Sequence, residues 1–411
     1  MNRYSERRRR LLEAVDDDSI VILFSGKAPY RSADETYDFS IDRNFYYLTG
    51  LDAEDMVLVL TKLSGKLNES IFILPFDENM ARWVGGRLLP EKVREISGIE
   101  RVSERNDLDD SLASLFNRNR LNDRFSVYFD FWHYAPDQAD TPALAYAHKL
   151  EKEYPYLIMK DIYPHLTKMR LIKDDYEISC IRKAIRTTNL GIRQMMKASR
   201  PGVNEMVMEG IFEFVLKQLS CKELAFQTIA ASGKRATILH YADNDQVMHN
   251  GELFLCDLGA TCEHYCADIS RTFPVNGRFN ERQKELYQIV LNAQKMVAWK
   301  AAPGMSLRDL NKIVTDYYEE ELPKHGLKKG VSEYYFHSVS HHLGLDTHDV
   351  DGGLPLEAGN VITDEPGLYV ADEGIGIRIE DDLLITETGA EVLSQEIDKE
   401  IEDIEDFMSG Q

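Results

Sequence analysis

Three features are scarce in this sequence of 411 residues: positive charge, long apolar runs and paired cysteines. The chain has 48 basic residues against 70 acidic ones, a formal net charge of -22, and this balance opposes binding to nucleic acid phosphates. No apolar run approaches the roughly 20 residues that span a bilayer. The N-terminus also lacks the hydrophobic segment of a secretion signal. We therefore expect a cytoplasmic protein that has neither nucleic acid nor a membrane as its partner.

The cysteines do not form a disulfide framework. Their number is odd, and all of them lie in the C-terminal part of the chain: Cys180, Cys221, Cys256, Cys262 and Cys266. Cys262 and Cys266 have a spacing that zinc ligands can have, but no second pair accompanies them. We expect all five to be reduced and buried.

The length of the chain and its hydrophobic content of 43% predict two packed domains, since a single core rarely grows beyond about 250–300 residues. Residues 1–160 alternate strand and helix patterns, which favours a smaller α/β domain. Its expected strands are residues 19–26, 55–62, 70–75 and 126–131, and its expected helices are residues 3–15, 89–96 and 142–152. Residues 161–173 are expected to be a linker, because a proline interrupts them.

Residues 174–411 show helices and strands in separate blocks, which is typical of an α+β domain with an antiparallel sheet. Periodic apolar residues predict four helices. These helices are expected at about 174–198, 204–219, 280–300 and 306–322. The acidic stretch EIDKEIEDIEDFMSG near the C-terminus predicts one more helix, exposed to solvent.

Two aspartates stand out in the stretch LCDLGATCEHYCADIS, residues 255–270. A hairpin whose turn lies between Cys262 and Glu263 would place Asp257 directly opposite Asp268, with Cβ atoms about 4.5 to 5.5 Å apart. Two carboxylates at that distance repel each other unless one is protonated or a cation lies between them. The alternative is a longer loop with both aspartates hydrated, because the turn has neither Gly nor Asn at its centre.

Further candidate ligands follow in FHSVSHHLGLDTHDV, TDEPGLYV and GIGIRIEDDLLIT. Four of the eleven histidines fall within twelve residues, and such clustering beside acidic residues favours a metal site. Glu365 precedes a proline, which biases its backbone toward an extended conformation. The period-two alternation of the last stretch places Glu380 on the same strand face as Arg378, which could orient it.

Four carboxylates and one imidazole form an oxygen-rich set with a formal charge of -4 that two divalent ions would neutralise. This composition is expected of a hydrolase with two metal ions. Oxygen ligands favour Mn²⁺, although Co²⁺ or Zn²⁺ can replace it. The four carboxylates are Asp257, Asp268, Glu365 and Glu380, and the imidazole comes from one of the clustered histidines.

Five motifs, in order and at compatible spacings, resemble the aminopeptidase P and prolidase family of metallopeptidases. They are ILHY, DLGATCEHYCADISRTFPVNG, HSVSHHLGLDTHD, EPGLY and GIRIEDD. The resemblance extends over nearly the whole chain, because RSADETYDFSIDRNFYYLTGLD is similar to the N-terminal domain of aminopeptidase P. It implies a pita-bread catalytic domain preceded by a non-catalytic domain, within an α+β fold.

The resemblance also assigns roles to individual residues. It makes Asp257, Asp268, His341, Glu365 and Glu380 the metal ligands, with Asp268 and Glu380 bridging the ions. It implies that His240, His337 and His348 contact the substrate or support the ligands, and that Arg378 neighbours the site. His342 receives no role. The family has glycine where this chain has His264, so a tight turn there is in question.

The implied activity is hydrolysis of the bond that precedes proline in a peptide, with release of the N-terminal residue. A homo-oligomer, a dimer or a tetramer, is implied as well, because Trp83 occupies the place of a tryptophan that reaches a neighbouring subunit's active site. The alternatives are a prolidase acting on Xaa-Pro dipeptides, a pseudo-peptidase that only binds, creatinase, and methionine aminopeptidase. The complete ligand set opposes the pseudo-peptidase and creatinase, and methionine aminopeptidases do not need the N-terminal domain.

Overall fold

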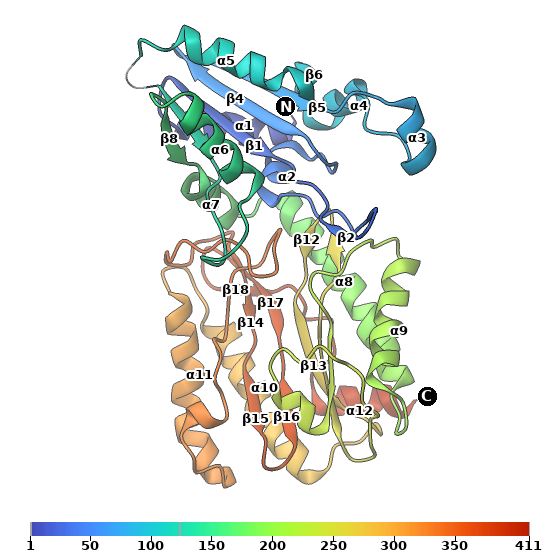
Figure 1. Ribbon diagram of the computed structural model, residues 1–411. Helices are drawn as coiled ribbons and strands as arrows, with labels where there is room; N and C mark the ends of the chain where they lie inside the picture. Colours follow the sequence, from blue (N-terminus) through green and yellow to red (C-terminus); the bar gives the residue numbers. More distant parts are fainter. Residues whose placement is uncertain (1, 123–124, 411) are drawn as a thin grey trace. The chain divides into compact units, whose positions relative to one another are not determined.

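The computed structural model describes residues 2–122 and 125–410 (Figure 1). The chain divides into two compact units, the first ending at Met169 and the second beginning at Arg170. Helix α7 (Tyr163–Leu171) occupies most of the segment that the sequence predicts to be a linker. The two units are described separately.

The first unit is built on one six-stranded sheet with the strand order β6-β5-β4-β1-β7-β8. Pairing is antiparallel between β1, β4 and β5, and parallel at β5–β6, β1–β7 and β7–β8. Apolar side chains from these strands and from α5 and α6 form its core. The strands are β1 (Ser19–Phe24), β4 (Val57–Leu63), β5 (Lys66–Ile73), β6 (Val102–Glu104), β7 (Ser126–Phe129) and β8 (Ile158–Asp161), with a small separate pair, β2 (Tyr30–Ser32) and β3 (Glu35–Thr36).

The helices and strands predicted for this unit are confirmed to within a few residues, but the helices α2, α3 and α5 and the strands β2, β3, β6 and β8 were not predicted. Helix α5 was missed because its first turn, LDDS, reads as a polar loop. The helices are α1 (Arg3–Ala14), α2 (Arg43–Thr49), α3 (Glu78–Val84), α4 (Pro90–Ser97), α5 (Leu108–Arg118) and α6 (Pro142–Glu153).

The second unit is an α+β domain in which every strand pairing is antiparallel, as predicted. Two three-stranded sheets, β13-β10-β9 and β14-β17-β18, are accompanied by the pairs β11–β12 and β15–β16. The strands are β9 (Ile229–Ser232), β10 (Leu253–Leu258), β11 (Thr261–Cys262), β12 (Tyr265–Cys266), β13 (Ile269–Pro274), β14 (Val361–Asp364), β15 (Gly367–Val370), β16 (Ile375–Arg378), β17 (Asp381–Ile385) and β18 (Ala390–Val392).

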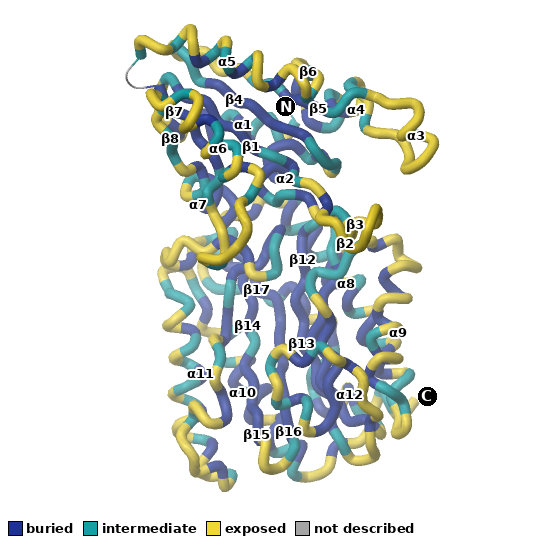
Figure 2. Tube along the Cα trace, viewed as in Figure 1, coloured by how far each residue is buried: buried dark blue, intermediate teal, exposed yellow. Residues whose placement is uncertain are grey.

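Helices lie on both sides of these strands, with α8 and α9 on one side and α11 on the other (Figure 1). The strands are buried along almost their whole length, whereas the helices expose their outer faces (Figure 2). The helices are α8 (Asp175–Ala198), α9 (Glu205–Gln218), α10 (Glu281–Lys300), α11 (Leu307–Glu321) and α12 (Ile401–Ser409). All five were predicted.

Side-chain caps explain where three of these helices begin. Asp174, Asn280 and Ser306 each accept a hydrogen bond from the backbone N–H three residues later, and the side chain there bonds back to the capping residue. Such a capping box satisfies two of the backbone donors that a helix leaves free at its start.

The hairpin between the two aspartates differs from the expected one. Cys262 pairs with Tyr265, so the turn consists of Glu263 and His264 alone. Both turn residues have positive φ angles, 51° and 63°, as a two-residue hairpin turn requires. The centre of the turn therefore moves by one residue, and Asp257 lies opposite Ser270, two residues beyond Asp268. The expected direct pairing of the aspartates was wrong because the sequence lacks the Gly or Asn that usually marks such a turn.

Gly259 lets the chain pass close to itself between the aspartates. A Cβ atom at this position would lie 1.8 Å from the carbonyl oxygen of Ala267. The backbone N–H of Ala267 donates to Ala260 O at 3.0 Å, which closes the loop. Any side chain at residue 259 would therefore push the strand that leads into Asp268 away from β10.

We predict that Gly259→Ala lowers the free energy of unfolding by about 2–3 kcal/mol, because overpacking at a backbone contact forces the strands apart. The matched control is Gly210→Ala on α9, where an added Cβ has nothing within 4 Å. That change should instead stabilise the protein by about 0.5–1 kcal/mol, the difference in helix propensity. Urea unfolding curves measure both variants, and equal effects would contradict the close approach.

Candidate metal centre

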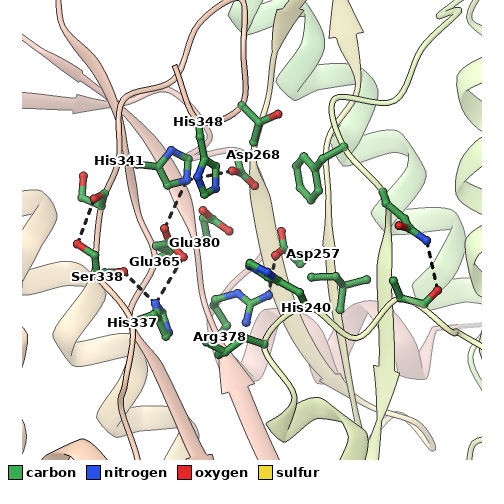
Figure 3. Close-up of a pocket in the computed structure, with 17 residues that line it drawn as sticks. His240, Asp257, Asp268, His337, Ser338, His341, His348, Glu365, Arg378 and Glu380 are labelled. Atoms are coloured by element: carbon green, nitrogen blue, oxygen red, sulfur yellow. Dashed lines mark hydrogen bonds and ion pairs between the residues drawn. The ribbon is translucent and has the colours of Figure 1, made fainter. Parts of the chain in front are cut away.

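All the site residues predicted from the sequence line one cavity of about 580 Å³ in the second unit (Figure 3). Apolar side chains, among them Phe226, Ile229 and Leu239, form another part of the wall. The predicted residues in the wall are His240, Asp257, Asp268, His337, His341, His348, Glu365, Arg378 and Glu380. His342 is not among the lining residues.

Two strand ends bring the carboxylates together. Asp257 lies on β10 and Asp268 directly precedes β13, the neighbouring strand. Glu380 follows β16, and its backbone N–H donates to Ser270 O at 3.1 Å, which joins it to β13. The backbone N–H of Asp268 donates to the carboxylate of Asp382 at 3.3 Å, so the two sheets are linked beside the cavity.

The histidine-rich segment lies along β14. Thr363 N donates to His341 O, and Leu343 N donates to Val361 O, each at 2.9 Å. Glu365 follows β14 directly, and its N–H donates to Val339 O at 2.9 Å. This pairing places an imidazole and a carboxylate from neighbouring segments in the same wall of the cavity.

His341 faces the carboxylates with its Nε2 atom. This atom lies 3.4 Å from Asp268 Oδ2 and 3.5 Å from Glu365 Oε1. Its Nδ1 is 3.0 Å from the carbonyl oxygen of His342. A carbonyl can only accept, so Nδ1 carries the proton, and in the neutral ring Nε2 presents a lone pair toward the carboxylates. That orientation is typical of a metal-binding histidine.

Arg378 organises the opposite wall of the site. Its guanidinium donates to Asp257 Oδ2 at 2.6 Å, to Tyr369 Oη at 2.9 Å and to Ser270 Oγ at 2.8 Å. Ser270 Oγ in turn donates to Glu380 Oε2 at 2.8 Å. The alternation of residues suggested a direct contact between Arg378 and Glu380. Arg378 instead reaches Glu380 through Ser270.

Electrostatics disfavour ionising all these carboxyls without a cation. Burial, followed by the charge of Asp257, raises the pKa of Asp268 well above its usual value. Burial and the charge of Asp268 do the same to the pKa of Glu380. Burial also raises the pKa of Glu365. One guanidinium does not offset four acidic groups held this close together.

The residues present fit divalent metal binding. Ligand atoms of Asp268, His341 and Glu380 all lie within 4.8 Å of one another. Asp257 Oδ1 is buried and has no hydrogen-bond partner among the described residues, which leaves it available as a ligand. Carboxylates with one imidazole are the donors that Mn²⁺ and similar ions prefer.

Three further histidines surround the cluster (Figure 3). His348 stacks on His341 with ring centroids 4.1 Å apart. His337 Nδ1 lies 3.7 Å from Glu365 Oε2, and its Nε2 is 2.9 Å from Tyr369 Oη. Burial lowers the pKa of both His337 and His348 to about 4. His240 lies across the cavity from this group.

Sequence reasoning missed two residues of this network, Ser270 and Tyr369. Ser270 lies two positions after Asp268, so the period of a strand places both side chains on the same face. Tyr369 follows Glu365 in the EPGLY motif. Alternation could have indicated the serine, but no sequence signal indicates that the tyrosine bonds to both Arg378 and His337.

A buried ion cluster holds the loop that carries His341 and His348. Asp349 accepts hydrogen bonds from Arg170 at 2.5 Å and from Lys173 at 3.0 Å, and all three side chains are at most 3% exposed. The backbone N–H of Asp349 donates to His342 O at 2.9 Å, which closes the loop. Burial alone would raise the pKa of Asp349, but the two cations lower it to about 2.

Comparisons with known proteins agree with this geometry. Residues 179–387 match the family described as Metallopeptidase family M24, and residues 4–123 match the aminopeptidase P N-terminal domain. The Xaa-Pro aminopeptidase of Escherichia coli is 34% identical over 98% of this chain and 97% of the relative. The Xaa-Pro aminopeptidase of Haemophilus influenzae is 33% identical over 99% and 97%.

Solved structures give the same result. A solved structure from Bacillus anthracis, described as an aminopeptidase P, superposes with a TM-score of 0.97. The two sequences are 41% identical, and the match covers 100% of this chain and 99% of that one. A zinc-substituted Escherichia coli aminopeptidase P in complex with product superposes with a TM-score of 0.90 at 32% identity, covering 99% and 98%.

The fold and the buried carboxylate and imidazole cluster thus define a metal-dependent peptidase with a pita-bread catalytic domain. The chain belongs to the aminopeptidase P family. No helix of the described residues is long and apolar enough to cross a membrane.

We predict that Asp349→Asn lowers the free energy of unfolding by about 3 kcal/mol at pH 7, because it removes the buried negative charge that Arg170 and Lys173 share. An asparagine at residue 349 does not titrate, so its own contribution to the free energy of unfolding should not change in acid. In the wild type, the contribution of Asp349 to the free energy of unfolding is complete above the pKa of about 4 that aspartate has in the unfolded chain. It disappears as the pH falls toward the pKa of Asp349 in the folded protein. The difference between the two proteins should therefore shrink between about pH 4 and pH 2.

Asp351→Asn is the matched control, because this side chain lies two positions away and is 54% exposed. Its effect on the free energy of unfolding should stay within about 0.5 kcal/mol. Denaturant titrations at several pH values measure both variants. A difference that is independent of pH would show that the charge of Asp349 does not stabilise the loop.

Proposed function

We propose that this protein is an Xaa-Pro aminopeptidase that binds two metal ions, hydrolyses the peptide bond preceding proline and releases the N-terminal residue. The observation that carries the proposal is the cluster of four carboxylates and His341 in a cavity with an apolar wall. The relatives named Xaa-Pro aminopeptidase, which align over almost the full chain, support the same activity.

In this proposal, the metal ligands are Asp257, Asp268, His341, Glu365 and Glu380. When bound, two divalent cations neutralise the carboxylates, polarise the substrate carbonyl and lower the pKa of water enough for it to attack near neutral pH. Mn²⁺ is the proposed resident ion because the donors are mostly oxygen, and Co²⁺ or Zn²⁺ can replace it. The zinc-substituted relative is consistent with such replacement.

The protein's own groups then handle the proton and the developing charge. Glu365 accepts the proton of the attacking water and delivers it to the leaving nitrogen of proline. His348 and His240 donate hydrogen bonds to the carbonyl oxygen as negative charge grows on it. Because its pKa is lowered to about 4, the His348 ring is neutral at pH 7 and donates through one N–H without adding a positive charge to the site.

His337 and Arg378 are proposed to position other groups. His337 lies between Glu365 and Tyr369, so it restrains the carboxylate that moves the proton. Arg378 holds Asp257 directly and Glu380 through Ser270. Both residues act through carboxylates that they contact.

The lining of the cavity favours an aminopeptidase over a prolidase. A prolidase must hold the free carboxylate of proline, and a basic group placed there would disfavour longer peptides. Among the described lining residues, Arg378 is the one with a guanidinium or ammonium group, and it is engaged with Asp257, Tyr369 and Ser270. The cavity therefore offers no spare cation for a terminal carboxylate.

We further propose a homo-oligomer, a dimer or a tetramer, in the cytoplasm. Trp83 on α3 is 84% exposed and its neighbour Val84 is 76% exposed. Exposed apolar groups of this size are typical of a surface that meets another protein. By the family resemblance, Trp83 takes the place of a tryptophan that reaches a neighbouring subunit's active site.

We predict that kcat/KM for an Xaa-Pro-Xaa tripeptide exceeds that for the matching Xaa-Pro dipeptide by about tenfold, equivalent to about 1.4 kcal/mol of transition-state stabilisation. The tripeptide continues beyond proline without placing a carboxylate against the cavity wall. The matched Xaa-Ala-Xaa peptide is the specificity control and should be cleaved slowly. Assays use one metal throughout, and a clear preference for the dipeptide would make the protein a prolidase.

A further inference from the structure

Helix α8 is bonded at two points to the β11–β12 hairpin, which joins the strands of Asp257 and Asp268. Tyr265 Oη donates to Glu177 Oε1 at 2.9 Å near the start of the helix. Ala260 N donates to Thr188 Oγ1 at 2.9 Å three turns later. Both bonds are buried, so this face of the helix is fixed against the hairpin.

Cys180 and Cys262 lie between these two anchors. Residue 180 follows Glu177 by three positions, so a helix places both on the same face. On the hairpin, residue 262 lies between Ala260 and Tyr265 in the same order. Helix α8 packs against β11, the strand that ends at Cys262, and a side-chain hydrogen bond between the two thiols shifts the pKa of each. The geometry of the anchors explains this contact between residues that are distant in the sequence.

The turn restricts how far Cys262 can move. Glu263 and His264 follow it at positive φ, and Tyr265 pairs with it across the two-residue turn. His264 Nδ1 also lies 3.4 Å from Glu223. A turn held in this way keeps Cys262 on the side of the hairpin that faces α8.

The two thiols differ in exposure and in acidity. Cys180 is fully buried, whereas Cys262 is only partly buried. The hydrogen bond from Cys180, aided by the charge of Lys183, lowers the pKa of Cys262 to about 7. The same hydrogen bond and burial raise the pKa of Cys180. Cys262 is therefore the thiol that ionises and meets solvent, which are the two properties of a reactive cysteine.

We propose that Cys180 and Cys262 form a reversible disulfide when the protein meets a hydroperoxide. The Cys262 thiolate attacks the peroxide, so an S–O bond forms, the O–O bond breaks and water leaves after protonation. The Cys180 sulfur then attacks the resulting sulfenic acid, so the S–S bond forms and a second water leaves. Two thiols and one hydrogen peroxide thus give one disulfide and two waters.

The remaining cysteines are directed elsewhere. Cys221 Sγ donates to Thr261 O at 3.1 Å and to Glu223 O at 3.3 Å. Cys266 Sγ lies 3.7 Å from Leu345 O, and Cys256 Sγ lies 3.6 Å from Arg271 O. None of the five thiols is a proposed metal ligand, so the disulfide does not rest on the proposed function.

The disulfide would cross-link α8 to the hairpin between the two aspartates. It would close a loop from residue 180 to residue 262 and add a covalent bond to a connection that is now held by hydrogen bonds and by packing such as that of Tyr176 on Tyr265. A small thiol reductant would restore the free pair, because the partly exposed Cys262 sulfur is open to thiol attack.

Peptide mapping of the full-length protein tests this proposal. The reduced protein is treated with about one equivalent of hydrogen peroxide, denatured and alkylated with N-ethylmaleimide. Its intact mass is measured, and a digest of it is mapped by mass spectrometry. We expect two fewer maleimide adducts than in the untreated protein, a linked peptide pair containing Cys180 and Cys262, and full reversal by dithiothreitol. Cys180→Ser and Cys262→Ser should each abolish the linked pair.

Cys221→Ser is the matched control, because Cys221 contacts the same hairpin at Thr261. This variant should still form the linked pair. A cross-link through Cys221 or Cys266, oxygen added to Cys262 without a cross-link, or retention of all five adducts would each overturn the proposal. If a serine variant does not fold, the map of the wild-type protein decides by itself.

Discussion

Mutual repulsion among four acidic side chains in one buried cavity is the constraint on which the rest of this structure depends. Burial and neighbouring acidic groups both raise the pKa of Asp268 and Glu380, and burial raises the pKa of Glu365. A chain that kept these groups close together without a cation would lose stability for no structural gain. The carboxylates of the cavity are therefore suited to binding divalent ions. This is consistent with the metallopeptidase family to which the chain belongs.

Several structural features serve this arrangement. Gly259 permits the close approach that leads the chain into Asp268. Arg378 holds Asp257 and reaches Glu380 through Ser270, so a single cation orients two carboxylates. The buried pair of Arg170 and Lys173 fixes Asp349, and with it the loop of the histidines. Neither Arg378 nor the pair of Arg170 and Lys173 neutralises the four carboxylates in the cavity.

The sequence predicted much of this, for reasons that can be named. Helical periodicity and capping residues such as Asp174 located the helices of the second unit. The density of histidines and acids indicated a metal site, and the resemblance to a family indicated which of these side chains share the cavity. The hairpin register was wrong because Glu263 and His264 adopt positive φ without the residues that usually signal it. The roles of Ser270 and Tyr369 could not be predicted, because their bonds to Arg378 depend on how distant segments pack.

The most direct test of the central claim is the number of metal ions bound per chain, measured by elemental analysis after equilibration with Mn²⁺ and removal of free ion. The account predicts two ions for the wild type and for His348→Ala, which removes a hydrogen-bond donor but no ligand. It predicts at least one ion fewer for Asp268→Asn, which removes a charge and keeps the shape of the side chain. A wild-type protein that binds no ion, or an Asp268→Asn variant that retains two, would contradict the account.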